Sequence, residues 1–410
     1  MKTLILLSSL LMAIATADRL FAAAPEGQKP YHAPPALVAG NNRFALDFYR
    51  RWSQSAEGSL ICSPYSISTA LAMVFAGAHR QTAEEMAKTL HFTLPSDELH
   101  TANAALLKQL TAAAPDRGYQ IRIANRLWVQ QGYTLLPPFL KTTQDDYGAE
   151  AASADFAQQP EAARATINSW VEKQTKNRIK DLVPAGGLSS DTRLVLANAI
   201  YFKGDWRWAF GKESTHKGQF SLTATKTADA EMMYQTREFR YFQRDDLQIL
   251  EMPYKSGDLA MDFLLPAKVD GLAALEKSLA SEKLEKWIAG LHDAEVIVSL
   301  PKFKMTAEID LGSHLAAMGM PLAFSPQGAD FSGMNGKTDL FLSKALHKAF
   351  VEVDETGTEA AAATEVDLAE SAKPGAASQE TFLADHPFLF LIRDTRSGSI
   401  LFIGRYTGPS

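Results

Sequence analysis

The sequence predicts a single α+β domain. Amphipathic helical segments fill most of the chain up to about residue 174, and long apolar strand segments follow without a regular strand–helix alternation. Regular alternation would indicate a doubly wound parallel sheet, whereas helices grouped ahead of strands indicate an α+β fold. No internal repeat or linker divides the chain after its first 36 residues, so we expect one domain over residues 37–410.

The predicted helices carry apolar residues three or four positions apart. In the first of them, Phe44, Phe48 and Trp52 share one face. The next follows Ser63-Pro64, where proline suits a first helical turn, and it is apolar enough to be buried on most sides. The expected helices span residues 41–53, 67–78, 81–90, 97–114, 138–147, 161–174 and 309–318, with further helices inside 272–291.

The predicted strands are either alternating or continuously apolar. Residues 120–130 alternate, which is typical of a strand with one buried face, whereas 193–202 are apolar almost throughout, which is typical of a buried central strand. The expected strands span residues 120–130, 193–202, 259–265, 295–304, 340–354, 388–392 and 399–406, with more than one strand inside 231–252.

The composition is that of an ordinary globular protein. The 410 residues are 46% hydrophobic and 21% charged, with a net charge of −6 and no run of lysine and arginine. We therefore expect no nucleic-acid partner and no heparin site. Cys62 is the single cysteine, so no intrachain disulfide can form, and its apolar surroundings indicate a small buried side chain.

Residues 1–17 have the three parts of a signal peptide. Lys2 supplies the positive charge, residues 4–14 the short apolar run, and Ala15-Thr16-Ala17 a cleavage site, with Ala22-Ala23-Ala24 as the alternative site. The apolar run is too short for a stable membrane anchor. We expect a secreted, extracellular protein (periplasmic if the source is bacterial) whose proline-rich residues 18–36 are disordered.

Residues 357–368 combine helix and strand preferences. Ala360 to Ala363 favour a helix, while the β-branched residues around them favour a strand. Read with a period of two, the segment has one uncharged face and one face with three carboxylates. The uncharged face consists of Thr358, Ala360, Ala362, Thr364, Val366 and Leu368. Residues 369–380 have loop composition, so we interpret about 355–380 as an exposed loop whose first half can become a strand.

No catalytic or metal-binding motif is present in the sequence. It contains neither Gly-x-Ser-x-Gly nor His-Glu-x-x-His, and no pair of histidines has metal-ligand spacing on one helix. We therefore expect no metal, no cofactor and no enzymatic activity. Asn198 lies in a buried strand, where an unpaired amide would cost roughly 1–3 kcal/mol. Ser63, Ser66 and His347 also need hydrogen-bond partners if they are buried. The sequence by itself does not show which of these residues bond to one another.

Several stretches of the chain, each weak alone, together carry a resemblance: Ser63 to Ala72, Leu194 to Trp206, Ser299 to Lys304, Ala329 to Gly333, Gly357 to Thr364 and Asp385 to Phe390. Taken in this order over nearly the whole mature length, the resemblance is to the serpin family. It implies a fold of three β-sheets with eight or nine helices and an exposed reactive loop. It also implies inhibition of serine proteases by a metastable suicide substrate.

The implied mechanism assigns roles to particular residues. A serine protease cleaves the loop and forms an acyl-enzyme, and the first half of the loop then inserts into the large sheet and traps a covalent 1:1 complex. The hinge would comprise Glu355, Gly357, Thr358, Glu359, Ala360, Ala361, Ala362 and Ala363, with a Glu355–Lys302 ion pair beside it. Ser63, Ser66, Asn198 and His347 would lie beneath the opening sheet, and Trp206 at the point of insertion. The protein is expected to act as a monomer.

The position of the cleaved bond follows from counting. Family members usually carry it fourteen residues after the hinge glycine, which from Gly357 is Ser371, with the bond Ser371–Ala372. A small residue there favours elastase-like or subtilisin-like proteases. Lys373 would suit a trypsin-like protease, although Pro374 disfavours cleavage after it, and Leu368 and Ala369 are further candidates.

The alternative is a non-inhibitory serpin with a carrier, chaperone or storage role. Such members usually have bulky, charged or proline residues in the hinge, and the small residues after Gly357 favour inhibition.

Overall fold

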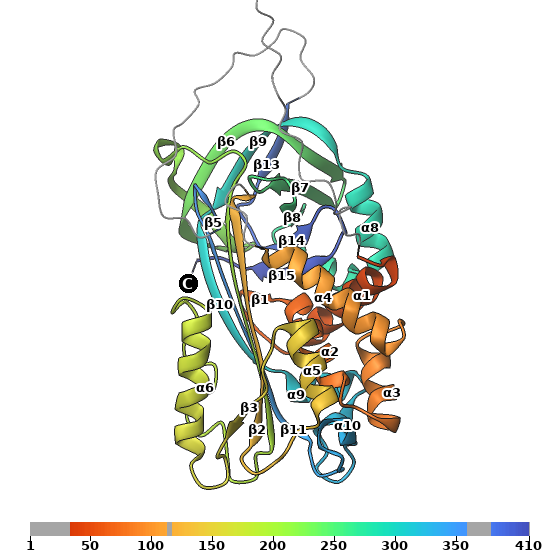
Figure 1. The fold of residues 1–410 in the computed structure, drawn as a ribbon. Coiled ribbons are helices and arrows are strands. Elements are labelled where there is room, and N and C mark those ends of the chain that lie inside the picture. Colours follow the sequence, from red (N-terminus) through yellow and green to blue (C-terminus); the bar gives the residue numbers. More distant parts are fainter. Residues whose placement is uncertain (1–32, 113–116, 359–378, 410) are drawn as a thin grey trace, which may run out of the picture. The chain divides into compact units, whose positions relative to one another are not determined.

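The computed structural model describes residues 33–112, 117–358 and 379–409, which all belong to one compact unit. Two mixed layers of strands lie at its centre, and helices cover them (Figure 1). The α+β class predicted from the sequence is confirmed. Most of the residues expected to be disordered lie outside the described part, but Pro35 and Ala36 begin a helix.

Ten α-helices occur in the described residues, whereas eight or nine were expected, and the shortest has only four residues. Their bounds are α1 Pro35–Ser53, α2 Pro64–Phe75, α3 Arg80–Thr89, α4 Ser96–Thr111, α5 Pro137–Tyr147, α6 Pro160–Gln174, α7 Leu272–Ser278, α8 Ser281–Ala289, α9 Leu311–Met318 and α10 Ser332–Asn335. Local capping explains several ends. Ser63 caps α2 by accepting a hydrogen bond from the Ser66 amide, and α5 ends at Gly148 in the left-handed conformation.

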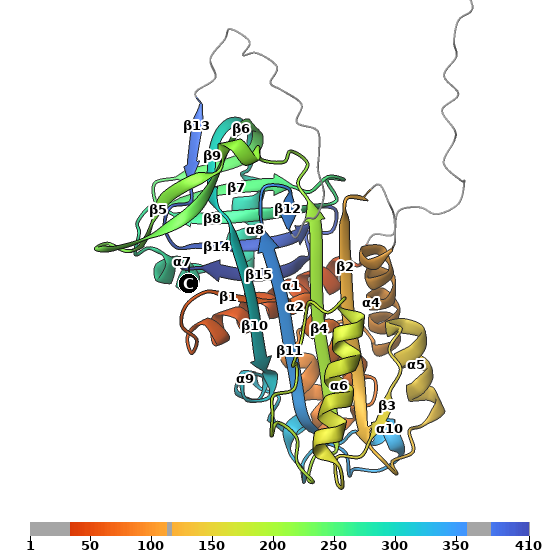
Figure 2. The ribbon, with the colours of Figure 1, turned by 90° about the vertical axis from the view of Figure 1, so that its left-hand side faces the viewer.

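A six-stranded sheet has the order β10-β11-β12-β4-β2-β3. Its strands are β2 Tyr119–Gln130, β3 Ala152–Ala154, β4 Leu194–Asp205, β10 Phe303–Asp310, β11 Leu342–Val353 and β12 Gly357–Thr358. Helix α6 covers one face, and α1, α2 and α5 lie on the other side (Figures 1 and 2). Strands β4 and β11 run parallel and pair directly from Leu194↔Leu342 to Tyr201↔Phe350. Beyond that point the two-residue β12 lies between them.

The remaining nine strands form one continuous hydrogen-bonded sheet. They are β1 Leu60–Cys62, β5 His216–Thr223, β6 Lys226–Arg244, β7 Leu247–Pro253, β8 Leu259–Pro266, β9 His292–Pro301, β13 Glu380–Leu383, β14 Phe388–Asp394 and β15 Ile400–Tyr406. The long β6 pairs with β5 and β9 along most of its length and with β7 at its end. Two of the three sheets expected from the resemblance are therefore joined through β6.

The strand predicted over 295–304 is in fact two strands in different sheets. Strand β9 ends at Pro301 and β10 begins at Phe303, while the amide of Lys302 between them bonds Glu231 O. Proline lacks a backbone donor and cannot continue the ladder. The helix predicted from residue 309 begins at Leu311, because Asp310 ends β10 and caps the helix. The short strands β3, β5, β12 and β13 were not predicted.

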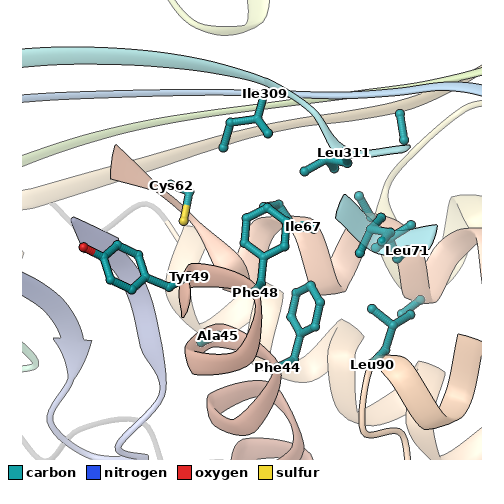
Figure 3. Close-up of a cluster of buried hydrophobic side chains, with 14 of the residues drawn as sticks. Phe44, Ala45, Phe48, Tyr49, Cys62, Ile67, Leu71, Leu90, Ile309 and Leu311 are labelled. Carbon is teal, nitrogen blue, oxygen red and sulfur yellow. The ribbon is translucent and has the colours of Figure 1, made fainter. Parts of the chain in front are cut away.

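The core lies between the helices and the two sheets. Phe44, Phe48, Ile67 and Leu71 of α1 and α2 pack under the six-stranded sheet (Figure 3). Cys62 is fully buried in the same cluster, as predicted, and burial raises the pKa of its thiol. No helix in the described part of the chain is long and apolar enough to cross a membrane.

Candidate functional site

Four polar residues separated in the sequence meet beneath the six-stranded sheet. The backbone amide of Ser63 donates to Nε2 of His347 at 3.1 Å, and Nδ1 of His347 lies 2.5 Å from Oδ1 of Asn198. Nδ2 of Asn198 lies 2.6 Å from Oγ of Ser66. Asn198 and His347 are direct neighbours in the β4–β11 register. The hydrogen bond that the buried Asn198 requires is therefore present, and it connects helix α2 with both central strands.

The geometry determines the protonation state of His347. Its Nε2 accepts from a backbone amide, so Nδ1 carries the proton and donates to Asn198. Burial lowers the pKa of His347 to about 3, because the charged ring would lose its hydration. Protonation would also break the bond from Ser63. The ring is therefore a neutral structural link between β11 and the start of α2.

Asn125 of β2 is a further member of this cluster that was not predicted. It is 9% exposed, and its Oδ1 accepts a hydrogen bond from Nδ2 of Asn198. The sequence could have predicted this residue. In an alternating strand, Asn125 lies on the same face as the apolar Ile121, Ile123 and Leu127. A polar residue on that face implies a buried partner.

Gly357 and Thr358, the last described residues before position 379, lie within the six-stranded sheet. Gly357 pairs with Asp205, and Thr358 pairs with Gly204 of β4 on one side and with Val353 of β11 on the other. Both residues are buried. A Cβ atom on Gly357 would lie 2.0 Å from the carbonyl oxygen of Gly204, so no side chain fits there. The chain thus turns back after β11 and runs antiparallel to both neighbours.

A hydrogen-bonded aspartate shapes that turn. Oδ1 of Asp354 accepts from the amides of Thr356 and Gly357 and from the Thr356 hydroxyl, at 2.7–3.1 Å. The Asp354 amide also donates to Gly357 O at 2.8 Å. The sequence reasoning missed this residue, although an aspartate three residues before a glycine is a common turn signal.

The predicted ion pair beside the hinge is present. Nζ of Lys302 lies 3.0 Å from Oε2 of Glu355, and the hydroxyl of Thr215 donates to Oε1 at 2.8 Å. Burial by itself would raise the pKa of Glu355. Its own backbone amide, Lys302 and Thr215 donate hydrogen bonds to the carboxylate and bring its pKa below the ordinary value. The ionised Glu355 therefore joins the turn to Lys302, between β9 and β10, and to the segment before β5.

Two aromatic residues, Trp206 and Tyr254, pack against each other beside β12, at the end of the six-stranded sheet. The ring of Trp206 stacks on Tyr254 with centroids 4.8 Å apart, and its Nε1 donates to Asp354 O at 3.0 Å. The hydroxyl of Tyr254 lies 2.8 Å from Oγ1 of Thr358. Burial raises the pKa of Tyr254, which stays neutral. Trp206 was predicted at this position. Tyr254 was not, because nothing in its own segment distinguishes it from a core tyrosine.

The structure thus brings together each predicted site residue that it describes, in two groups. Ser63, Ser66, Asn198 and His347 lie under the middle of the sheet, and Trp206, Lys302, Glu355, Gly357 and Thr358 lie at its end. Glu359 to Ala363, Ser371 and Ala372 lie outside the described residues. Their roles, like those of the two groups, stay predictions. Within the described part, no cluster of three histidine, cysteine or acidic side chains is arranged to hold a metal.

This fold and site define a class of proteins in which the chain turns back after one strand of a mixed sheet and enters the space between two parallel strands. A family model described as "Serpin (serine protease inhibitor)" matches residues 39–409, and the chain belongs to the serpin family. Leukocyte elastase inhibitor of Homo sapiens is 44% identical over 390 residues, covering 91% of this chain and 99% of that protein. The inhibitor of the same name from Xenopus laevis is 42% identical over 383 residues, with the same coverage. These relatives are named as inhibitors, which agrees with the expectation that the chain is not an enzyme.

Solved structures share the fold. Uncleaved ovalbumin superposes with a TM-score of 0.84 at 34% identity, covering 91% of this chain and 100% of that one. Human thyroxine-binding globulin complexed with thyroxine superposes with a TM-score of 0.83 at 32% identity, covering 91% and 98%. The serpin fold expected from the sequence is therefore confirmed.

Proposed function

We propose that this protein inhibits a serine-type endopeptidase as a suicide substrate. The protease nucleophile attacks a carbonyl carbon of the reactive loop, the peptide bond breaks, and the new amino terminus leaves. The loop segment that remains esterified to the protease then inserts between β4 and β11. Insertion carries the protease along and displaces its catalytic groups, and small displacements of those groups slow hydrolysis of the ester steeply.

The observation that carries this proposal is the position of β12. Gly357 and Thr358 already occupy the space between β4 and β11 and run antiparallel to both. Residues that continue in this direction would extend one ladder on each side. The uncharged face that begins at Thr358 has side chains small enough for the buried side of such a strand.

The energy balance favours insertion after cleavage. Insertion breaks the direct ladder between β4 and β11, together with the His347–Asn198 bond, and replaces them with two ladders. About a dozen additional hydrogen bonds at about 1 kcal/mol each correspond to ~10 kcal/mol. The uncleaved loop is held at both ends and cannot release this energy, so the intact protein is metastable.

The target we propose is an elastase-like protease, with subtilisin-like proteases as the second class. The relatives named leukocyte elastase inhibitor support this choice, as does the small residue at the predicted Ser371–Ala372 bond. We also propose export after removal of residues 1–17, which amino-terminal sequencing of the mature protein would test. The complex is proposed to be covalent, with one monomeric inhibitor per protease.

A panel of proteases tests the proposal. The protein is incubated with elastase-, subtilisin-, chymotrypsin- and trypsin-like enzymes, the products are separated in SDS, and the released carboxy-terminal peptide is mapped by mass. We expect an SDS-stable complex with an elastase-like enzyme and a peptide that begins at Ala372. Cleavage of the loop without any complex, and without a rise in melting temperature, would contradict inhibition.

The same panel separates inhibition from the carrier, chaperone or storage alternative. Fold similarity cannot do so, because one structure with this fold is a thyroxine-binding globulin. A carrier would be cleaved without trapping the protease.

A further inference from the structure

In the part of the chain that the structure describes, the outer edge of strand β2 lacks a strand partner over most of its length. β3 pairs only with Trp128 to Gln130, although β2 begins at Tyr119. Figure 2 shows β2 as the last long strand of the sheet, with β3 at its lower end and α4 and α5 beyond it. At about 3.3 Å per residue, some 25–30 Å of this edge is open.

The direction of the free backbone groups follows from the ladder. Gln130 N donates to Arg193 O, and Asp205 N donates to Gly118 O, so the even-numbered residues of β2 point their backbone groups toward β4. The odd-numbered residues Tyr119, Ile121, Ile123 and Asn125 consequently point theirs outward. Within the described residues, none of these outward groups has a hydrogen-bond partner. A row of free donors and acceptors is a template for an added strand.

A cavity of about 1080 Å³ runs along this edge. Residues 118–126 line it continuously, and α4, residues 145–150 and Trp170 form its walls. It exceeds the ~300–1,000 Å³ typical of small-molecule pockets, and its floor is a peptide backbone. An extended peptide matches both features.

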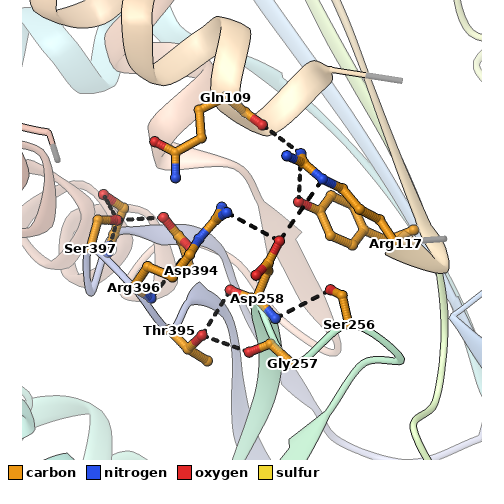
Figure 4. A network of polar contacts seen from close by, with 11 residues as sticks. Gln109, Arg117, Ser256, Gly257, Asp258, Asp394, Thr395, Arg396 and Ser397 are labelled. Carbon is orange, nitrogen blue, oxygen red and sulfur yellow. Dashed lines mark hydrogen bonds and ion pairs between the residues drawn. The ribbon is translucent and has the colours of Figure 1, made fainter. Parts of the chain in front are cut away.

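The edge is also held in place at its start. Nη1 of Arg117 donates to Gln109 O of α4 at 2.7 Å and to the hydroxyl of Tyr119 at 3.2 Å (Figure 4). Its Nε lies 3.9 Å from Asp258, which also pairs with Arg396 at 3.1 Å. Because these contacts fix β2 against α4, an incoming strand would find the edge already ordered.

The charges in the cavity differ at its two ends. Lys108 and the exposed Arg122 line the end near the start of β2. Asp145, Asp146 and Glu150, which precede β3 in the chain, line the other end, where Arg126 pairs with Glu150 at 3.6 Å, so carboxylates outnumber cations there. An antiparallel strand would place its carboxy-terminal end beside the cations and its amino-terminal end beside the carboxylates.

We propose that the open edge of β2 binds an extended peptide segment of a partner protein by antiparallel strand addition. The segment has β-branched residues at its centre, a basic residue at its amino-terminal end and an acidic residue at its carboxy-terminal end. This binding requires no reactive loop and is independent of protease inhibition.

The probe is the labelled, capped peptide Lys-Thr-Val-Thr-Val-Thr-Glu, followed by fluorescence anisotropy with the full chain. We expect saturable binding of this peptide. A peptide with the terminal Lys and Glu exchanged should bind at least tenfold more weakly. A peptide in which every second backbone nitrogen is methylated should not bind. Absence of binding at millimolar peptide, or equal binding of the methylated peptide, would overturn the proposal.

Ile123 offers a matched pair of variants. Ile123→Pro removes an outward amide that the β4 ladder does not use, whereas Ile123→Ala shortens the same side chain and keeps the amide. We expect binding to weaken at least tenfold in Ile123→Pro and to change less than threefold in Ile123→Ala. Equal effects of the two variants would overturn strand addition.

Hydrogen exchange gives a second measurement that does not depend on the folding of Ile123→Pro. In the wild-type chain, the amides of Ile121 and Ile123 should exchange quickly and become at least tenfold slower when the peptide is bound. Unchanged exchange would contradict the proposal. Sedimentation that shows a dimer abolished by Ile123→Pro would assign the edge to a second copy of the chain and would also overturn it.

Discussion

The hydroxyl of Tyr254 lies 2.8 Å from that of Thr358, and both side chains are fully buried. This contact joins the residue that follows β7 of the nine-stranded sheet to β12 of the six-stranded sheet. Trp206 stacks on the same tyrosine and bonds the turn that precedes the hinge. Gly357 and Thr358 are therefore held in a specific position between β4 and β11.

Thr358→Arg is expected to convert the inhibitor into a substrate. Position 358 has no exposed surface, and burying an unpaired guanidinium there would cost several kcal/mol, which blocks insertion. The measurement is the yield of SDS-stable complex with an elastase-like protease. Thr358→Ser, which keeps the hydroxyl and a small side chain, is the control and should retain the complex. A wild-type yield from Thr358→Arg would contradict the assigned role.

Tyr254→Phe is expected to loosen the hinge without unfolding the core. The variant keeps the ring that stacks on Trp206 but leaves Oγ1 of Thr358 without its partner, at a cost of about 1 kcal/mol. Amide exchange at Gly357 and Thr358 should become about fivefold faster. Tyr241→Phe removes a hydroxyl that contacts Gln243 and Gln248 and not Thr358, and it should leave these amides unchanged. Equal exchange rates in the two variants would argue against the contact.

Glu355→Gln is expected to raise the stoichiometry of inhibition by weakening the link between the turn and Lys302. Because the Lys302 side chain is 36% exposed, solvent screens the pair, and the loss of global stability should stay within ~1 kcal/mol. The matched control is Glu352→Gln, which breaks the neighbouring and more exposed Lys304–Glu352 pair at 3.5 Å. Identical stoichiometries for the two variants would remove any special role for Glu355.

His347 is expected to make the protein less stable in acid. Its folded-state pKa of about 3 lies below the ~6.5 of an unfolded histidine, so between these pH values only the unfolded state binds the proton. The contribution of His347 is complete above pH ~6.5 and falls by about 1.4 kcal/mol per pH unit as the pH drops toward 3. Urea unfolding measured from pH 7 to 4.5 gives the free energy of unfolding at each pH. This free energy should fall less steeply with decreasing pH in His347→Gln than in the wild type, by about this amount per pH unit. Parallel curves for the wild type and the variant would contradict the prediction.

Local patterns were enough to predict most long elements. The spacing of Phe44, Phe48 and Trp52 gave helix α1, and the apolar run over 193–202 gave strand β4. Strand β10 was missed even though Phe303, Met305 and Ile309 alternate with polar residues. The prediction had joined its first residues to β9, and only the change of sheet at Lys302 separates the two.

The sequence by itself determined the fold class, the family resemblance and the small, uncharged face that begins at Thr358, because these depend on residue type and spacing along the chain. It also showed that Asn198 needs a buried partner. Only the tertiary structure decided that the partners are His347, Ser66 and Asn125, and that Tyr254 meets Thr358. Those contacts depend on which strands lie side by side and in what register. That arrangement results from the packing of the whole core, and no local pattern encodes it.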